Sequence, residues 1–179
     1  MMKEIIFRLL EKALEDFYAH EKINLELDVH EIAHGHRLAI YFENRLREYD
    51  NSNEEKLFER YFVDIEFNRM EEGKVKACLY DSELHNMRCD ILLHSKGQVP
   101  ERENLLIVEL KKEGSTDKEQ DDINEITRMV SPAEDNAPDK SICNTLLGVY
   151  LKFGLDGYFG SKYWHDGNRI VKESFGRGM

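Results

Sequence analysis

The stretch NLLIVELK, residues 104–111, constrains the fold of this chain more than any other. Its apolar residues run unbroken from Leu105 to Val108, whereas a strand with one face in water would alternate apolar and polar residues. Such a run is typical of a strand buried on both faces, so other elements must cover its sheet from two sides. With 179 residues, one domain can bury a core of this kind without disulfide or metal staples.

Periodicity predicts the elements around this strand. Apolar residues at helical spacing predict helices at about 2–20, 31–49 and 117–130. Thr116 and Glu119 form a capping box at the start of the third helix. Further strands are predicted at 60–68 and 75–80, joined as a hairpin, and at 89–94 and 145–153. The predicted fold is α/β, with a mixed central β-sheet flanked by helices.

We expect a single domain over residues 1–179. Its parts would be N-terminal helices at about 2–49, a sheet core at about 60–153, and a C-terminal hairpin or edge strand at about 154–179. The first helix interrupts its apolar residues with charged ones, which is unlike a signal peptide or a membrane span. The three cysteines lack CxxC spacing and fit reduced thiols. Together these features predict a cytoplasmic protein that does not enter a membrane.

The net charge of −11 repels nucleic acid and acidic membranes from the molecule as a whole. This argues against a non-specific coat for DNA. It does not exclude a nuclease, because an enzyme that holds a divalent metal in carboxylates needs acidic residues at its centre.

A carboxylate and an ammonium lie together at the end of the 104–111 strand. Because strand side chains alternate, Glu109 and Lys111 point to the same face. Asp90 comes directly before the apolar ILL of the preceding strand. Two carboxylates on neighbouring strands with a lysine beside them suit Mg²⁺ or Mn²⁺, which prefer oxygen ligands. The alternative is that Asp90 and Glu109 are only ion-pair partners of Arg88 and Lys111.

The tripeptide E-x-K has no weight by itself, because the chain repeats it at 54–56 and 72–74. Only the copy at 109–111 ends a continuous hydrophobic strand and follows a strand with an acid at its start. The placement therefore carries the prediction.

With these residues in view, RCDILLH followed by ENLLIVELKK resembles the PD-(D/E)xK nuclease superfamily, whose fold is restriction-endonuclease-like. The resemblance runs from about residue 28 to 153. It is closer to small uncharacterised members that pair a VD-x-E-(Y/F)-N-R strand, here residues 63–69, with an R-x-D and an E-x-K strand. Cys89 replaces the proline of the motif. The following helix has Asp122 and Glu125 where relatives often carry D-x-x-K, so a basic contact is missing.

The resemblance implies a metal-dependent nuclease that hydrolyses phosphodiester bonds of nucleic acid, with DNA as the expected substrate. Asp90 and Glu109 would hold Mg²⁺ or Mn²⁺, with the main-chain carbonyl of Leu110 as a further ligand. Lys111 would orient and help deprotonate the attacking water, and Glu43 would be the acid that an N-terminal helix contributes. We also expect substrate contacts from four basic side chains: His36, Arg37, Arg69 and Arg88.

The segment HEIAH, residues 30–34, reads as H-E-x-x-H, which on a helix could place His30 and His34 on one zinc ion with Glu31 as general base. A zinc metallopeptidase needs a third ligand, but Arg37 and Ile40 stand where the extended motif has glycine and histidine. The zinc peptidase therefore ranks below the nuclease. A third hypothesis is a nuclease-like fold without catalysis, a binding or regulatory module that forms a homodimer or engages a basic protein partner.

Overall fold

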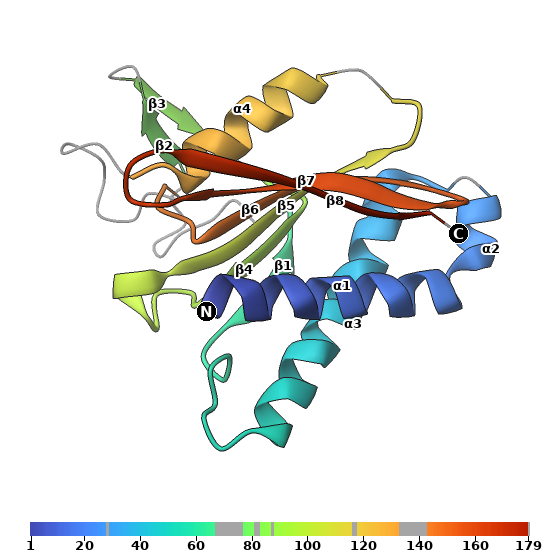
Figure 1. Cartoon of the computed structure of the whole chain (residues 1–179), viewed down its shortest axis with the longest axis horizontal. Coiled ribbons are helices and arrows are strands. Elements are labelled where there is room, and N and C mark those ends of the chain that lie inside the picture. The colour runs from blue at the N-terminus through green and yellow to red at the C-terminus, as the bar shows by residue number, and fades with distance from the viewer. Residues whose placement is uncertain are drawn as a thin grey trace.

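The computed structural model describes residues 1–27, 29–66, 77–80, 83–86, 88–115, 118–132 and 143–178, with the backbone alone for 78–80 and 83–86. The predicted class is confirmed: the chain is α/β, with a mixed sheet and helices on both of its faces (Figure 1). The helices are α1 (Met2–His20), α2 (Lys22–Glu26), α3 (Glu31–Ser52) and α4 (Glu119–Val130), with a 3-10 turn at Pro100–Arg102. The strands are β1 (Phe62–Ile65), β2 (Ala77–Tyr80), β3 (Glu83–Asn86), β4 (Ile91–His94), β5 (Asn104–Lys112), β6 (Leu147–Gly154), β7 (Gly157–His165) and β8 (Ile170–Gly178).

The main sheet has the order β1-β4-β5-β6-β7-β8. Strands β5 and β6 are parallel, and every other neighbouring pair in this sheet is antiparallel. The connection between the parallel strands contains α4, as a parallel pair requires a crossover. The chain after 154 forms the long β7–β8 hairpin at one edge, which agrees with the predicted C-terminal hairpin.

Strand β5 lies inside the sheet and is buried from Asn104 to Leu110, as its apolar run predicts. One face packs against α1 and α3 through Leu106, Val108 and Leu110. The other face packs against α4, where Ile107 meets Ile126. In Figure 1 the sheet accordingly separates α4 from α1 and α3. Charged side chains of β5 therefore gather at its end, at Glu109–Lys112.

One local prediction was wrong. Strand β1 pairs with β4, and the described part of the 75–80 strand, β2, pairs with β3 in a separate two-stranded sheet. Strand β4 is buried along its whole length, so the backbone groups on its edge away from β5 need a partner strand, and β1 supplies it. Helix α4 begins at Glu119 with Lys118 at its N-cap. The predicted capping box includes Thr116, which lies outside the described residues, so it stays a prediction.

The cysteines also differ from expectation. Cys143 is disulfide-bonded, while Cys89 is a buried thiol outside any disulfide, so reduced thiols were the wrong prediction for Cys143. Within the described residues, no helix combines the length and apolar character needed to cross a bilayer.

Candidate functional site

Three of the predicted residues meet where β4 begins and β5 ends. Asp90 directly precedes β4, and β4 runs antiparallel to β5 with Ile91 opposite Val108. The Asp90 Oδ2 accepts a hydrogen bond of 2.7 Å from the Leu110 backbone N–H. The strand order therefore brings Asp90 beside Glu109 and Lys111, as the sequence predicted.

Glu109 is a buried carboxyl group in acidic surroundings. Its side chain and backbone together are 7% exposed, and its Oε1 has no hydrogen-bond partner among the described residues. Burial raises the pKa of Glu109 well above its ordinary value, and the negative charges of Asp90, Asp122 and Glu125 add to this, with Lys111 opposing. An ionised Glu109 therefore destabilises the fold unless a cation compensates its charge.

Asp90 shares this environment. Burial raises the pKa of Asp90, although the Leu110 N–H, the Lys111 charge and a hydrogen bond with the Glu109 carboxyl partly offset the rise. Because both carboxyl groups have raised pKa values and are joined by that hydrogen bond, they form a coupled pair that retains protons more readily than isolated acids do.

Lys111 is held between two helices. Its Nζ lies 3.1 Å from Asp122 Oδ2 on α4 and 4.0 Å from Glu31 Oε1 on α3. Burial would lower the pKa of Lys111, but the hydrogen bond and charge of Asp122, with the charges of Glu31 and Asp90, outweigh it and raise the pKa. The ammonium is thus a fixed positive charge beside the Asp90–Glu109 pair.

The acid of α3 that reaches this cluster is Glu31, and not Glu43 as expected. Glu31 Oε2 accepts a 3.0 Å hydrogen bond from the Lys112 backbone N–H. Burial raises the pKa of Glu31, while Lys111 and the Lys112 N–H lower it. Glu43 instead accepts hydrogen bonds from Arg47 Nε at 2.7 Å and from the Val63 N–H at 3.0 Å. Twelve residues separate the two acids on one helix, about 18 Å along its axis, so both cannot reach the same site.

The histidines of HEIAH have separate roles in the structure. His30 is the exposed N-cap of α3, where its Nδ1 accepts from the Ile32 N–H at 3.3 Å. His34 is buried, with its ring 5.7 Å from that of Phe17 and 5.0 Å from that of Phe153. His30 caps the helix and His34 packs in the core, so the structure does not place them together as a zinc pair.

The predicted substrate contacts are spread over the surface. Arg37 Nε donates to Glu21 at 2.6 Å, and Arg88 lies 3.5 Å from Glu66. His36 is exposed on α3. Arg69 lies outside the described residues. Of the three that the structure describes, His36 and Arg37 follow Glu31 on α3, and Arg88 comes two residues before Asp90 in the chain.

Sequence reasoning missed two acids on α4 and one tyrosine on β6. The sequence suggests that Asp122 and Glu125 lie on a solvated helix face, yet α4 crosses the sheet so that their negative charges raise the pKa of Glu109. Tyr150 lies directly beside Glu109 in the β5–β6 register, and its buried hydroxyl has no hydrogen-bond partner among the described residues. Burial, then the charges of Glu119, Asp122 and Glu31, raises its pKa, so the phenol stays protonated. The available signal for Asp122 was its place in the first turn of the helix that follows the buried strand β5.

The carboxylates are not preassembled around an ion. Within the described ranges, no group of three or more His, Cys, Asp or Glu side chains is arranged to hold a metal ion. Asp90, Glu31 and Asp122 are instead occupied by backbone N–H groups and by Lys111. A cation would have to compete with these contacts.

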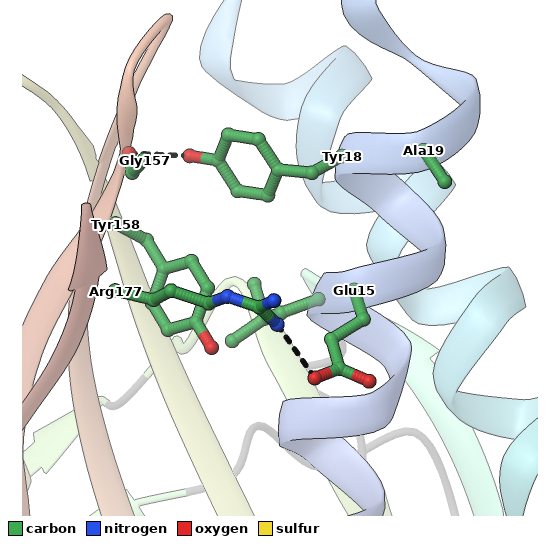
Figure 2. Close-up of a pocket in the computed structure, with 7 residues that line it drawn as sticks. Glu15, Tyr18, Ala19, Gly157, Tyr158 and Arg177 are labelled. Atoms are coloured by element: carbon green, nitrogen blue, oxygen red, sulfur yellow. Dashed lines mark hydrogen bonds and ion pairs between the residues drawn. The ribbon is translucent and has the colours of Figure 1, made fainter. Parts of the chain in front are cut away.

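A separate cavity of about 410 Å³ lies between α1 and the β7–β8 hairpin. Figure 2 shows Tyr18 reaching from α1 to the Gly157 carbonyl and Arg177 paired with Glu15 across the cavity. The Tyr18 hydroxyl donates to the Gly157 carbonyl at 2.5 Å, and Arg177 lies 2.7 Å from the Glu15 carboxylate. Among the described residues that line it, Glu15 is the one acid and Arg177 the one base, and they are paired with each other, so the cavity offers fewer reactive groups than the Glu109 site. Comparisons with family models, curated proteins and solved structures found no match to the chain.

Proposed function

We propose that the chain is a divalent-metal-dependent nuclease that hydrolyses phosphodiester bonds, with its site at Asp90, Glu109 and Lys111. The observation that carries the proposal is Glu109: a buried carboxyl group, surrounded by other acids, with one oxygen unpartnered among the described residues. Structural carboxylates in a core are normally paired. A bound cation would offset both the cost of burying the Glu109 charge and its repulsion by the neighbouring acids.

The donor set suits Mg²⁺ or Mn²⁺ because every candidate ligand is an oxygen. Asp90, Glu109 and the Leu110 carbonyl would hold the ion, which lowers the pKa of a bound water and stabilises negative charge on a phosphodiester. The resemblance to the PD-(D/E)xK superfamily agrees with this assignment, with Glu31 in the place first expected for Glu43.

The chain's own residues divide the remaining work. Lys111 presents a fixed ammonium that can orient the attacking water and the phosphate oxygen. Asp122 holds the Lys111 Nζ in place at 3.1 Å, and Glu31, partly exposed and with a raised pKa, can accept a proton near the pair. Burial strengthens each of these interactions relative to water.

The second candidate is the non-catalytic binding or regulatory module. The net charge of −11 and the occupied carboxylates favour it. We further propose nucleic acid, with DNA as the expected form, as the substrate and the cytoplasm as the location. The disulfide-bonded Cys143 stands against the cytoplasm, where disulfides are rare, and thiol titration of the native protein would decide.

The test is cleavage of single- and double-stranded DNA and RNA with Mg²⁺ or Mn²⁺ by the wild type, Glu109→Ala, Lys111→Ala and Glu54→Ala. Glu54→Ala is the control, because Glu54 is an exposed acid in another copy of E-x-K. Cleavage that is lost in the first two variants and kept in the third supports the nuclease. Absence of cleavage by the wild type on every substrate refutes it, and zinc-dependent hydrolysis of a peptide that is lost in His30→Ala would point to the peptidase instead.

A further inference from the structure

An open groove of about 710 Å³ lies beside the first turn of α3. Val29, Ile32 and Ala33 form its apolar wall, and His30, His36 and Arg37 contribute its polar groups. Ile32 is 40% exposed, so part of its apolar side chain is available to a ligand in the groove. A groove of this size can hold a small organic group.

The charge of the groove differs from that of the molecule. Acids outnumber Lys and Arg by 36 to 25 in the chain, yet none of the described residues that line the groove is acidic. The Arg37 side chain is 48% exposed; its Nε forms an ion pair with the buried Glu21 carboxylate at 2.6 Å, and its guanidinium lies 5.7 Å from the Tyr41 ring, so the groove has an exposed cation that already has one acidic partner. An apolar wall with histidines and an arginine at its edge suits a ligand with flat apolar faces and a nearby negative charge.

The groove and the candidate active site share one helical turn. Glu31 lies between His30 and Ile32, and its carboxylate reaches the Lys112 N–H and Lys111 at the end of β5. A ligand in the groove is therefore separated from the carboxylate site by the first turn of α3 only.

We propose that this groove is a subsite for a nucleobase of the strand whose phosphodiester lies at Asp90 and Glu109. The inference rests on the proposed nuclease function and names the part of the substrate that the enzyme grips. The base would pack against Ile32 and Ala33, and the adjoining phosphate would face Arg37. A second copy of the chain is the other occupant that the test separates.

The chain offers a matched pair of variants, Ile32→Asp and Ile40→Asp. Both residues are exposed isoleucines on α3, at 40% and 50%, but only Ile32 lines the groove. Each variant adds one negative charge to the same helix, so general repulsion of nucleic acid is equal to a first approximation. Binding of a fluorescein-labelled ten-nucleotide single strand is measured by anisotropy, with Ca²⁺ as the cation.

We expect Ile32→Asp to weaken binding about tenfold or more relative to Ile40→Asp, because it replaces the apolar contact of Ile32 with the base by a charge, whereas Ile40 lies outside the groove. AMP should compete with the labelled strand in the wild type. Equal affinities for the two variants would overturn the subsite, even if the wild type cleaves nucleic acid.

The two proposals can fail separately. Binding that is sensitive to Ile32→Asp without any cleavage removes the nuclease and keeps the subsite. An absence of both binding and cleavage overturns both, and a change from dimer to monomer in Ile32→Asp alone, seen by sedimentation, assigns the groove to a second copy.

Discussion

Replacing Glu109 by Gln should stabilise the fold at neutral pH while it removes cation binding. The folded-state pKa of Glu109 is raised well above its value of 4.5 in the unfolded chain, so the folded protein holds this proton more tightly. Stability from this group is therefore fully present below pH 4.5 and falls as the pH rises towards the folded-state pKa. At a pH above both the unfolded-state and the folded-state pKa, each pKa unit between them lowers the free energy of unfolding by about 1.4 kcal/mol.

The size of the effect follows from burial. Glu109 is 7% exposed, so solvent screens its charge little. A neutral amide removes the repulsion from Asp90, Asp122 and Glu125 but still leaves a buried polar group, which limits the gain. We expect Glu109→Gln to be about 1 to 3 kcal/mol more stable than the wild type at pH 8 and close to it at pH 5.

Urea unfolding at pH 5 and pH 8, with EDTA and then with Mn²⁺, measures this difference. Mn²⁺ at one hundred times its Kd should stabilise the wild type by about 2.7 kcal/mol and Glu109→Gln far less. Glu54→Gln is the control, since it removes an acid from an exposed E-x-K copy. The reasoning is refuted if wild type and Glu109→Gln share one pH profile, or if Mn²⁺ stabilises both equally.

Three further outcomes are expected. Asp122→Asn should lower kcat of cleavage about tenfold with KM little changed, because Lys111 loses its ion-pair partner at 3.1 Å. The control Asp121→Asn, which changes an exposed acid on the same helix, should leave kcat unchanged. Equal kcat losses in the two variants would remove Asp122 from the site. Glu43→Gln should lower the free energy of unfolding in urea by about 1 to 2 kcal/mol, because it weakens the hydrogen bonds from Arg47 and the Val63 N–H, and it should leave the Mn²⁺ affinity unchanged. Loss of Mn²⁺ binding in a calorimetric titration would return Glu43 to the site. Tyr18→Phe should lower the free energy of unfolding by about 1 kcal/mol, measured by thermal unfolding, because the Tyr18 hydroxyl hydrogen-bonds to the Gly154 and Gly157 carbonyls. We expect the variant to cleave at the wild-type rate, and a lower rate would give the cavity in Figure 2 a role in catalysis.

The sequence by itself determined the strand at the centre and the chemistry at its end. An apolar run buried on both faces requires helices on both sides, and β5 has them. Strand alternation placed Glu109 and Lys111 on one face, and the position of Asp90 before the preceding strand placed it next to them. These predictions succeeded because strand geometry is local.

Only the tertiary structure decided which distant groups join this site. A helical pattern shows which face of α3 is buried but not which end of the helix lies at the end of β5, so Glu43 and Glu31 could not be ranked. In the same way, the acids of α4 appear solvated until the crossover between the parallel strands β5 and β6 carries that helix over the sheet. The pairing of β1 with β4 had the same origin, because a partner strand is chosen by packing across the whole sheet.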